Sequence, residues 1–133
     1  MTHIVAGYPT MKDCEALAQK MAQKGIPFIE IQIPSSDPVA DGPVIMQANQ
    51  DSLKNGTTVK DCFALMSRLA KRYPKTHFLF MTYFNIAHNY GLKKFCQKAK
   101  QCGCYGLIIP DIPLDEEKQE NYLKICQKHK LNP

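Results

Sequence analysis

The feature that most limits how this chain can fold is a repeated switch in the spacing of its apolar residues. Short apolar runs lie at about residues 3–6, 28–33, 77–83 and 105–109, and each is nearly continuous in its hydrophobicity. Between them, apolar residues recur every three or four positions, which is the period of an amphipathic helix. Continuous apolar strands are covered on both faces, so the pattern predicts a parallel sheet alternating with helices.

The helices are predicted from this spacing and from residues that favour helix ends. Pro43 opens one segment, and proline is well tolerated in a first helical turn. Thr58 followed by Asp61 resembles the capping pair of the next helix. The predicted helices cover about residues 12–24, 43–54, 58–73, 91–101 and 115–129.

The count of strands predicts half of a closed barrel. A (β/α)8 barrel needs about 250 residues, whereas this chain has 133 residues. Leu131, Asn132 and Pro133 read as the approach to a fifth strand. The expected fold class is therefore α/β of the (β/α)8 TIM-barrel type, with about the first four βα units forming a single domain over residues 1–133.

Charge and cysteine usage narrow the class of protein further. The net charge of +5 is spread over many lysines without an aromatic-plus-basic pattern, so no nucleic-acid partner is expected. No apolar run approaches the roughly 20 residues of a membrane span. Cys14, Cys62, Cys96 and Cys126 fall on the apolar faces of predicted helices, as small buried hydrophobes do. The remaining two cysteines form a C-x-C that lacks zinc spacing, so no metal is expected and the location is predicted to be cytoplasmic.

The most informative short segment runs from Glu30 to Pro43. Glu30 stands inside the second apolar run, and Asp41 lies in the Asp-, Pro- and Gly-rich loop that follows. A carboxylate on a buried strand is costly unless it is paired or its pKa shifts. Active sites often accept that cost, so the two acids are predicted to share one pocket and perform general acid–base chemistry. A salt-bridged Glu30 and a turn-forming Asp41 are the structural alternatives.

Polar residues also mark the ends of the other strands. Thr82, Tyr83 and Asn85 follow the third run, and Asp111 follows the fourth. In a parallel α/β sheet, active residues gather where strands end and the following loops begin. We expect Thr82 and Asn85 to orient the loop after the third strand by hydrogen bonds, without a catalytic role.

Four blocks together resemble the tryptophan synthase α-subunit family, the indole-3-glycerol-phosphate lyases. The blocks are Val5–Pro9, Phe28–Gln47, Met81–Asn85 and Gly106–Pro113, in the family's order and with natural spacing. The most specific is the loop reading Ser-Asp-Pro at residues 36–38 and Asp-Gly-Pro at residues 41–43. The resemblance extends over nearly the whole chain.

This resemblance implies a reaction, site residues and a partner. The reaction is retro-aldol cleavage of indole-3-glycerol phosphate to indole and glyceraldehyde 3-phosphate, without a cofactor. Glu30 would be the general base on the hydroxyl beside the indole ring, and Asp41 would hold the indole N–H and stabilise positive charge on the ring. Tyr83 would line the indole pocket, and Asp111 would order the neighbouring loops of the substrate site. The partner would be a tryptophan synthase β subunit in an α2β2 tetramer, facing the loop that contains Asp37 and Pro38.

The sequence departs from the family pattern at four positions. Gln32 stands where glycine is usual, Ser35 where phenylalanine is usual, Tyr8 where aspartate is usual, and His3 takes a normally aromatic position. Gln32 places a side chain close to Glu30, where it is expected to alter the pKa of that acid or the pocket volume. Ser35 is expected to remove an apolar contact from the partner-facing loop.

Three functional readings stay open at this point. The family's phosphate-binding loops follow its later strands and are absent here, so we expect little or no lyase activity from the chain alone. A non-catalytic α-like subunit that docks on and modulates a β subunit is the alternative, and another phosphosugar-binding barrel enzyme is a third possibility. Half a barrel also exposes sheet edges and apolar surface, so self-association or a partly molten state is expected in solution.

Overall fold

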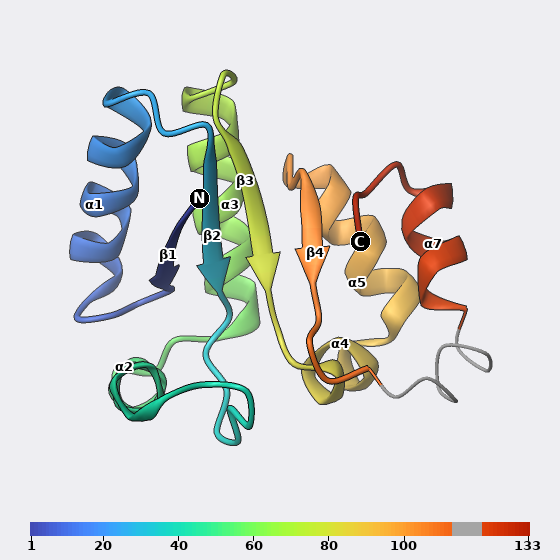
Figure 1. The fold of residues 1–133 in the computed structure, drawn as a ribbon, viewed down its shortest axis with the longest axis horizontal. Helices are drawn as coiled ribbons and strands as arrows, with labels where there is room; N and C mark the ends of the chain where they lie inside the picture. The colour runs from blue at the N-terminus through green and yellow to red at the C-terminus, as the bar shows by residue number, and fades with distance from the viewer. Residues whose placement is uncertain (113–120) are drawn as a thin grey trace.

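The computed structural model describes residues 1–112 and 121–133. Strands and helices alternate along the chain (Figure 1). They are β1 (Thr2–Val5), α1 (Met11–Gln23), β2 (Phe28–Gln32), α2 (Pro43–Lys54), α3 (Val59–Arg72), β3 (His77–Met81), α4 (Phe84–Tyr90), α5 (Leu92–Gln101), β4 (Gly106–Ile108) and α7 (Tyr122–Lys128). The strands pair in the order β1-β2-β3-β4, every pair parallel. The predicted α/β half-barrel architecture is confirmed.

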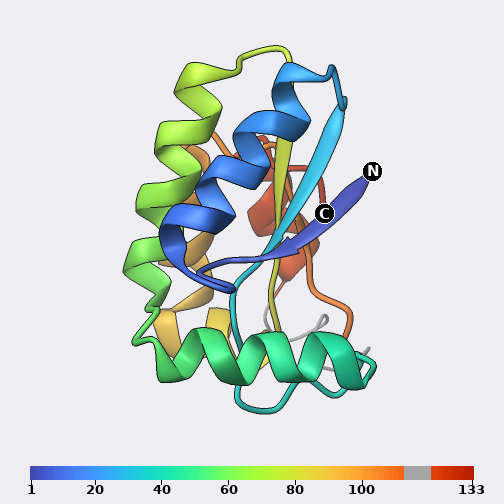
Figure 2. The ribbon, with the colours of Figure 1, turned by 90° about the vertical axis from the view of Figure 1, so that its left-hand side faces the viewer.

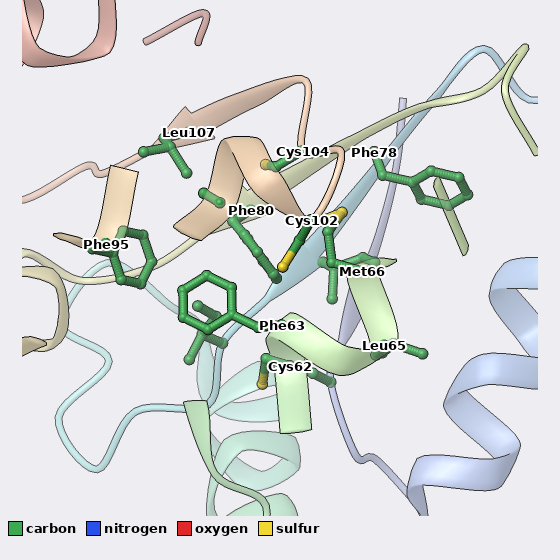
Figure 3. Packing of buried hydrophobic residues seen from close by; sticks show 14 of the residues in the cluster. Cys62, Phe63, Leu65, Met66, Phe78, Phe80, Phe95, Cys102, Cys104 and Leu107 are labelled. Atoms are coloured by element: carbon green, nitrogen blue, oxygen red, sulfur yellow. The ribbon is translucent and has the colours of Figure 1, made fainter. Parts of the chain in front are cut away.

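One face of the sheet packs on the helices. Seen edge-on, α1 and α3 lie on one side of β1 and β2 (Figure 2). The side chains that point toward the helices, such as Ile31 and Phe80, are fully buried. Phe63 of α3 meets Phe80 edge to face, with ring centroids 5.6 Å apart, and lies 5.3 Å from the ring of Phe95 on α5 (Figure 3). This aromatic cluster joins α3, β3 and α5 into one apolar core.

The opposite face carries the alternate residues of the same strands. His3, Glu30, Leu79 and Gly106 are paired in register across the four strands, one residue out of step with the core row. This mixed face is the interior side of the half barrel. Helices α2 and α4 lie beyond the carboxyl ends of the strands (Figure 1), so these ends are where loops can bring further side chains to the same face.

Local signals explain most element ends. Thr58 and Asp61 form the predicted capping box at the start of α3, with the Thr58 hydroxyl and the Asp61 carboxylate satisfying each other's backbone N–H groups. The approach to a fifth strand is also confirmed, because Asn132 forms a parallel bridge with Gly106 of β4. Helix α4 was not predicted. The helix expected over residues 115–129 is seen as α7, and residues 115–120 of that range lie outside the described residues.

The six cysteines are present as buried thiols rather than as disulfides. Cys14, Cys62, Cys96 and Cys126 belong to the hydrophobic core, as their helical spacing predicted. Their burial raises the pKa of the Cys14 thiol and leaves it a packing group rather than a reactive one. Within residues 1–112 and 121–133, no helix has the length and apolar character needed to cross a membrane.

Candidate active site

Glu30 lies in the middle of β2, beside His3 of β1. Its Oε1 is 3.8 Å from Nε2 of His3, and its side chain is only 14% exposed. Burial raises the pKa of Glu30; His3 counteracts this shift, and the negative charge of Asp41 adds to it. A carboxylate held in this way is a stronger proton acceptor near neutral pH than an exposed glutamate.

Gln32 follows on the same face of β2 and is fully buried. Its Oε1 lies 2.8 Å from Nε2 of His3, and its Nε2 donates to Oδ2 of Asp41 over 2.6 Å. Its Nε2 also lies 3.5 Å from Oδ1 of Asn49 on α2. Asn49 in turn accepts from the backbone N–H of Ser35 over 2.8 Å, which fixes the start of the loop. Gln32 therefore connects β1 to the loop after β2.

Asp41 is held from a second direction by Tyr83, the residue just before α4. The Tyr83 hydroxyl donates to Oδ2 of Asp41 over 2.9 Å and accepts from the backbone N–H of Ala40 over 3.1 Å. Burial, together with the adjoining Asp41 carboxylate, raises the pKa of Tyr83 to about 12, so the phenol stays protonated as a donor. The loop that carries Asp41 is thereby tied to the end of β3.

Asp111 lies after β4 and reaches the start of α4. Its Oδ1 accepts from the backbone N–H of Phe84 over 2.8 Å, in the first turn of that helix. This bond joins the loops after β3 and β4, next to Tyr83. Thr82 and Asn85 were expected to orient the loop after β3 by hydrogen bonds. Asn85 lies in α4 and accepts from the N–H of Ile86. The expectation for Thr82 was wrong, because its buried hydroxyl has no hydrogen-bond partner among the described residues.

The residues expected to face a partner divide into exposed and buried ones. Asp37 is exposed, whereas Pro38 is buried against the loop. Ser35 is also buried, and its Oγ accepts from the N–H of Asp37 over 3.2 Å. A side chain at position 35 thus supports the loop from within rather than forming part of its outer surface.

The structure brings Glu30, Asp41 and Tyr83 to one end of one sheet face, with Asp111 supporting the same rim. A hollow of about 500 Å³ lies at the opposite end of the strands, where Lys71, Lys100 and Tyr105 contribute to its wall. Its lining contains no carboxylate, and neither Glu30 nor Asp41 belongs to it. Among the described residues, no three His, Cys, Asp or Glu side chains gather as a metal site.

Sequence reasoning missed the hydrogen bonds that connect these residues. Gln32 was singled out only for its closeness to Glu30, and Asn49 was not considered. A polar residue on the apolar side of a predicted helix or strand was the available signal, because buried amides are almost always hydrogen-bonded. Both residues are fully buried and bonded here.

Sequence similarity to known proteins identifies the family. All 133 residues match the family model described as tryptophan synthase alpha chain. The chain is 44% identical over its whole length to the tryptophan synthase alpha chains of Syntrophotalea carbinolica and Desulfotalea psychrophila, covering 51% of each. It spans about half the length of the curated relatives it matches.

Solved structures agree with the sequence comparison. A structure from Aquifex aeolicus superposes with a TM-score of 0.89 at 37% identity, over 98% of this chain and 51% of the other. A crystal structure of tryptophan synthase from M. tuberculosis gives a TM-score of 0.89 at 31% identity over the same shares. The chain belongs to the tryptophan synthase alpha chain family and matches about half the length of its members.

Proposed function

We propose that this chain provides the acid–base residues of an indole-3-glycerol-phosphate lyase. The observation that carries the proposal is the joining of Glu30 and Asp41 at one rim: Gln32 bonds Asp41, His3 contacts both Gln32 and Glu30, and the charge of Asp41 reaches Glu30. Two carboxylates in different environments can take different roles in one reaction.

In this proposal Glu30 removes the proton from the substrate hydroxyl next to the indole ring. The same carboxyl first delivers a proton to C3 of the ring and then, as the carboxylate, takes the hydroxyl proton, so that Glu30 ends protonated as it began. The carbon–carbon bond breaks, its electron pair returns to the protonated ring to give indole, and the hydroxyl carbon becomes the aldehyde carbon. Asp41 accepts the indole N–H and stabilises the positive charge on the protonated ring. Tyr83 orients Asp41, and Asp111 orders the loop at the same rim.

In the proposal, the rest of the site comes from outside residues 1–133. Residues 1–133 form one domain that contributes four strands, and a second half contributes the groups that bind phosphate. Buried thiols that form no disulfide fit a reducing compartment, so the activity is assigned to the cytoplasm. The chain alone is expected to release little or no indole because the phosphate would lack its binding groups.

A chimera tests this proposal directly. The chain is fused to the part of the Syntrophotalea carbinolica protein that it does not match, and indole release from indole-3-glycerol phosphate is measured. Glu30→Gln and Asp41→Asn should each lower kcat about 10²–10⁴-fold, the range for loss of an acid–base group. Asp51→Asn, at an exposed ion pair with Lys54, is the matched control and should leave the rate unchanged. Full activity of the Glu30→Gln chimera would refute the proposal.

A specific observation also favours docking on a tryptophan synthase β subunit, with or without catalysis. The segment that begins with Asp37 exposes apolar side chains: Val39 is 68% and Val44 78% exposed. Val39 lies in the loop and Val44 in the first turn of α2. Exposed apolar residues on adjoining segments are typical of an interaction surface. Val39→Asp with Val44→Asp should abolish capture by an immobilised β subunit, whereas Leu17→Asp on α1, also exposed, should not. Capture that survives the double substitution excludes this surface.

A further inference from the structure

Gln32 is a buried amide whose two ends are both used. Its nitrogen donates to the Asp41 carboxylate over 2.6 Å, and its oxygen lies 2.8 Å from Nε2 of His3. A carboxylate oxygen only accepts hydrogen bonds, so the amide nitrogen has to face Asp41. The amide oxygen is then left to face His3.

The orientation of the amide decides the state of the histidine. An amide oxygen only accepts, so the ring nitrogen 2.8 Å away must carry a hydrogen. Neutral His3 therefore has its proton on Nε2 rather than Nδ1. We propose that Gln32 is a positioning residue that clamps Asp41 with its amide nitrogen and holds a proton on Nε2 of His3 with its amide oxygen.

This arrangement affects both Asp41 and Glu30. Asp41 receives Gln32 and Tyr83 on the same oxygen, Oδ2, while Oδ1 receives no hydrogen bond from the described residues. Oδ1 is thus the oxygen available to an indole N–H, a role that rests on the proposed function. Nε2 of His3 lies 3.8 Å from Oε1 of Glu30. Because that nitrogen already carries a hydrogen, which is directed at Gln32, it cannot accept a proton from Glu30.

The test uses the chain itself and needs no turnover. The ring nitrogens of His3 are followed by ¹⁵N NMR to identify the tautomer, and hydrogen exchange of the Ala40 amide reports on the loop. Gln32→Met keeps the length of the side chain but removes both bonds. Gln32→Glu keeps an acceptor for His3 and loses the donor to Asp41. Gln47→Met is the matched control, since Gln47 donates to Asp51 over 2.9 Å on the exposed side of α2.

The proposal makes a separate forecast for each variant. The parent chain should show the Nε2–H tautomer and a protected Ala40 amide. In Gln32→Met the amide should exchange roughly tenfold faster, as loss of a bond to a carboxylate predicts, and the tautomers should mix. In Gln32→Glu exchange should quicken by a similar factor while the tautomer is kept. Gln47→Met should change neither.

Several results would overturn the proposed role of Gln32. An Nδ1–H tautomer or an unprotected Ala40 amide in the parent chain would show that the clamp does not form, whatever the variants do. Equal spectra and exchange in the parent and in Gln32→Met would show that the amide positions nothing. Because none of these readouts measures indole release, failure here and failure of the proposed lyase activity remain separate results.

Discussion

The two faces of the sheet use the same strands in different ways. On the helix side, Ile31 and Phe80 are fully buried and are stabilised by apolar burial and packing rather than by hydrogen bonds. On the interior side, Gln32 and Glu30 depend on named partners at fixed distances. The first face determines that the chain folds, and the second determines which groups meet at the rim. Substitutions should therefore affect the two faces by different mechanisms.

The largest effect is expected on the helix side. Phe80→Ala removes a fully buried ring in contact with Phe63 and should lower the free energy of unfolding by about 3–5 kcal/mol. Leu79→Ala, the adjacent residue on the half-buried interior side, is the control and should cost about 1–2 kcal/mol. Urea unfolding followed by circular dichroism measures both. Equal losses would mean that the interior side is packed as tightly as the helix side.

The interior side should instead govern association. Leu79→Glu places a charge among its half-exposed apolar residues and should lower the mean mass measured by light scattering, because the chain is expected to self-associate. Leu17→Glu on α1 is the matched control, since Leu17 is 46% exposed on the other side. A parent chain that is a monodisperse monomer with a sharp thermal transition would contradict the expected self-association.

A smaller loss is expected where the rim depends on a single hydroxyl. Tyr83→Phe removes the bonds to Asp41 and Ala40 and should cost about 1–2 kcal/mol of unfolding free energy. Tyr73→Phe removes an exposed bond from Gln23 and should change stability by less than about 0.5 kcal/mol. Thermal unfolding of the two variants makes the comparison. If Tyr73→Phe lowers the unfolding free energy as much as Tyr83→Phe, the hydrogen bonds at the rim stabilise the fold no more than an exposed one.

The smallest expected effect is a dependence of folding stability on pH. Since burial raises the pKa of Glu30 in the folded state, its contribution to stability is present below the ordinary value of 4.5 and is lost as pH rises through the raised value. Glu30→Gln lacks this loss, so its stability relative to the parent should increase from pH 4 toward neutrality. Unfolding curves across that range show the trend. A relative decrease would mean that attraction to His3 outweighs burial.

The fold could be predicted from the sequence because buried side chains make apolar residues recur at the spacing of a strand or a helix. Runs such as Phe28–Ile33 are read directly as strands, and the Thr58–Asp61 box marks a helix start. Helix α4 was missed because a seven-residue helix gives too few turns to show a period. Glu30 and Asp41 were found through their motif, but the bridge between His3, Gln32 and Asp41 joins residues 29 and 9 positions apart, which no local pattern encodes.

The bridge between Gly106 and Asn132 makes the two margins of the sheet unequal. At the β4 margin, the backbone N–H of Leu107 already donates to the Asn132 carbonyl over 2.8 Å. At the β1 margin, pairing among the described residues is with β2 alone. An incoming strand therefore finds an open template along Thr2–Val5. Pairing through the β1 margin joins two molecules, whereas the bridge at Asn132 hinders pairing at the β4 margin.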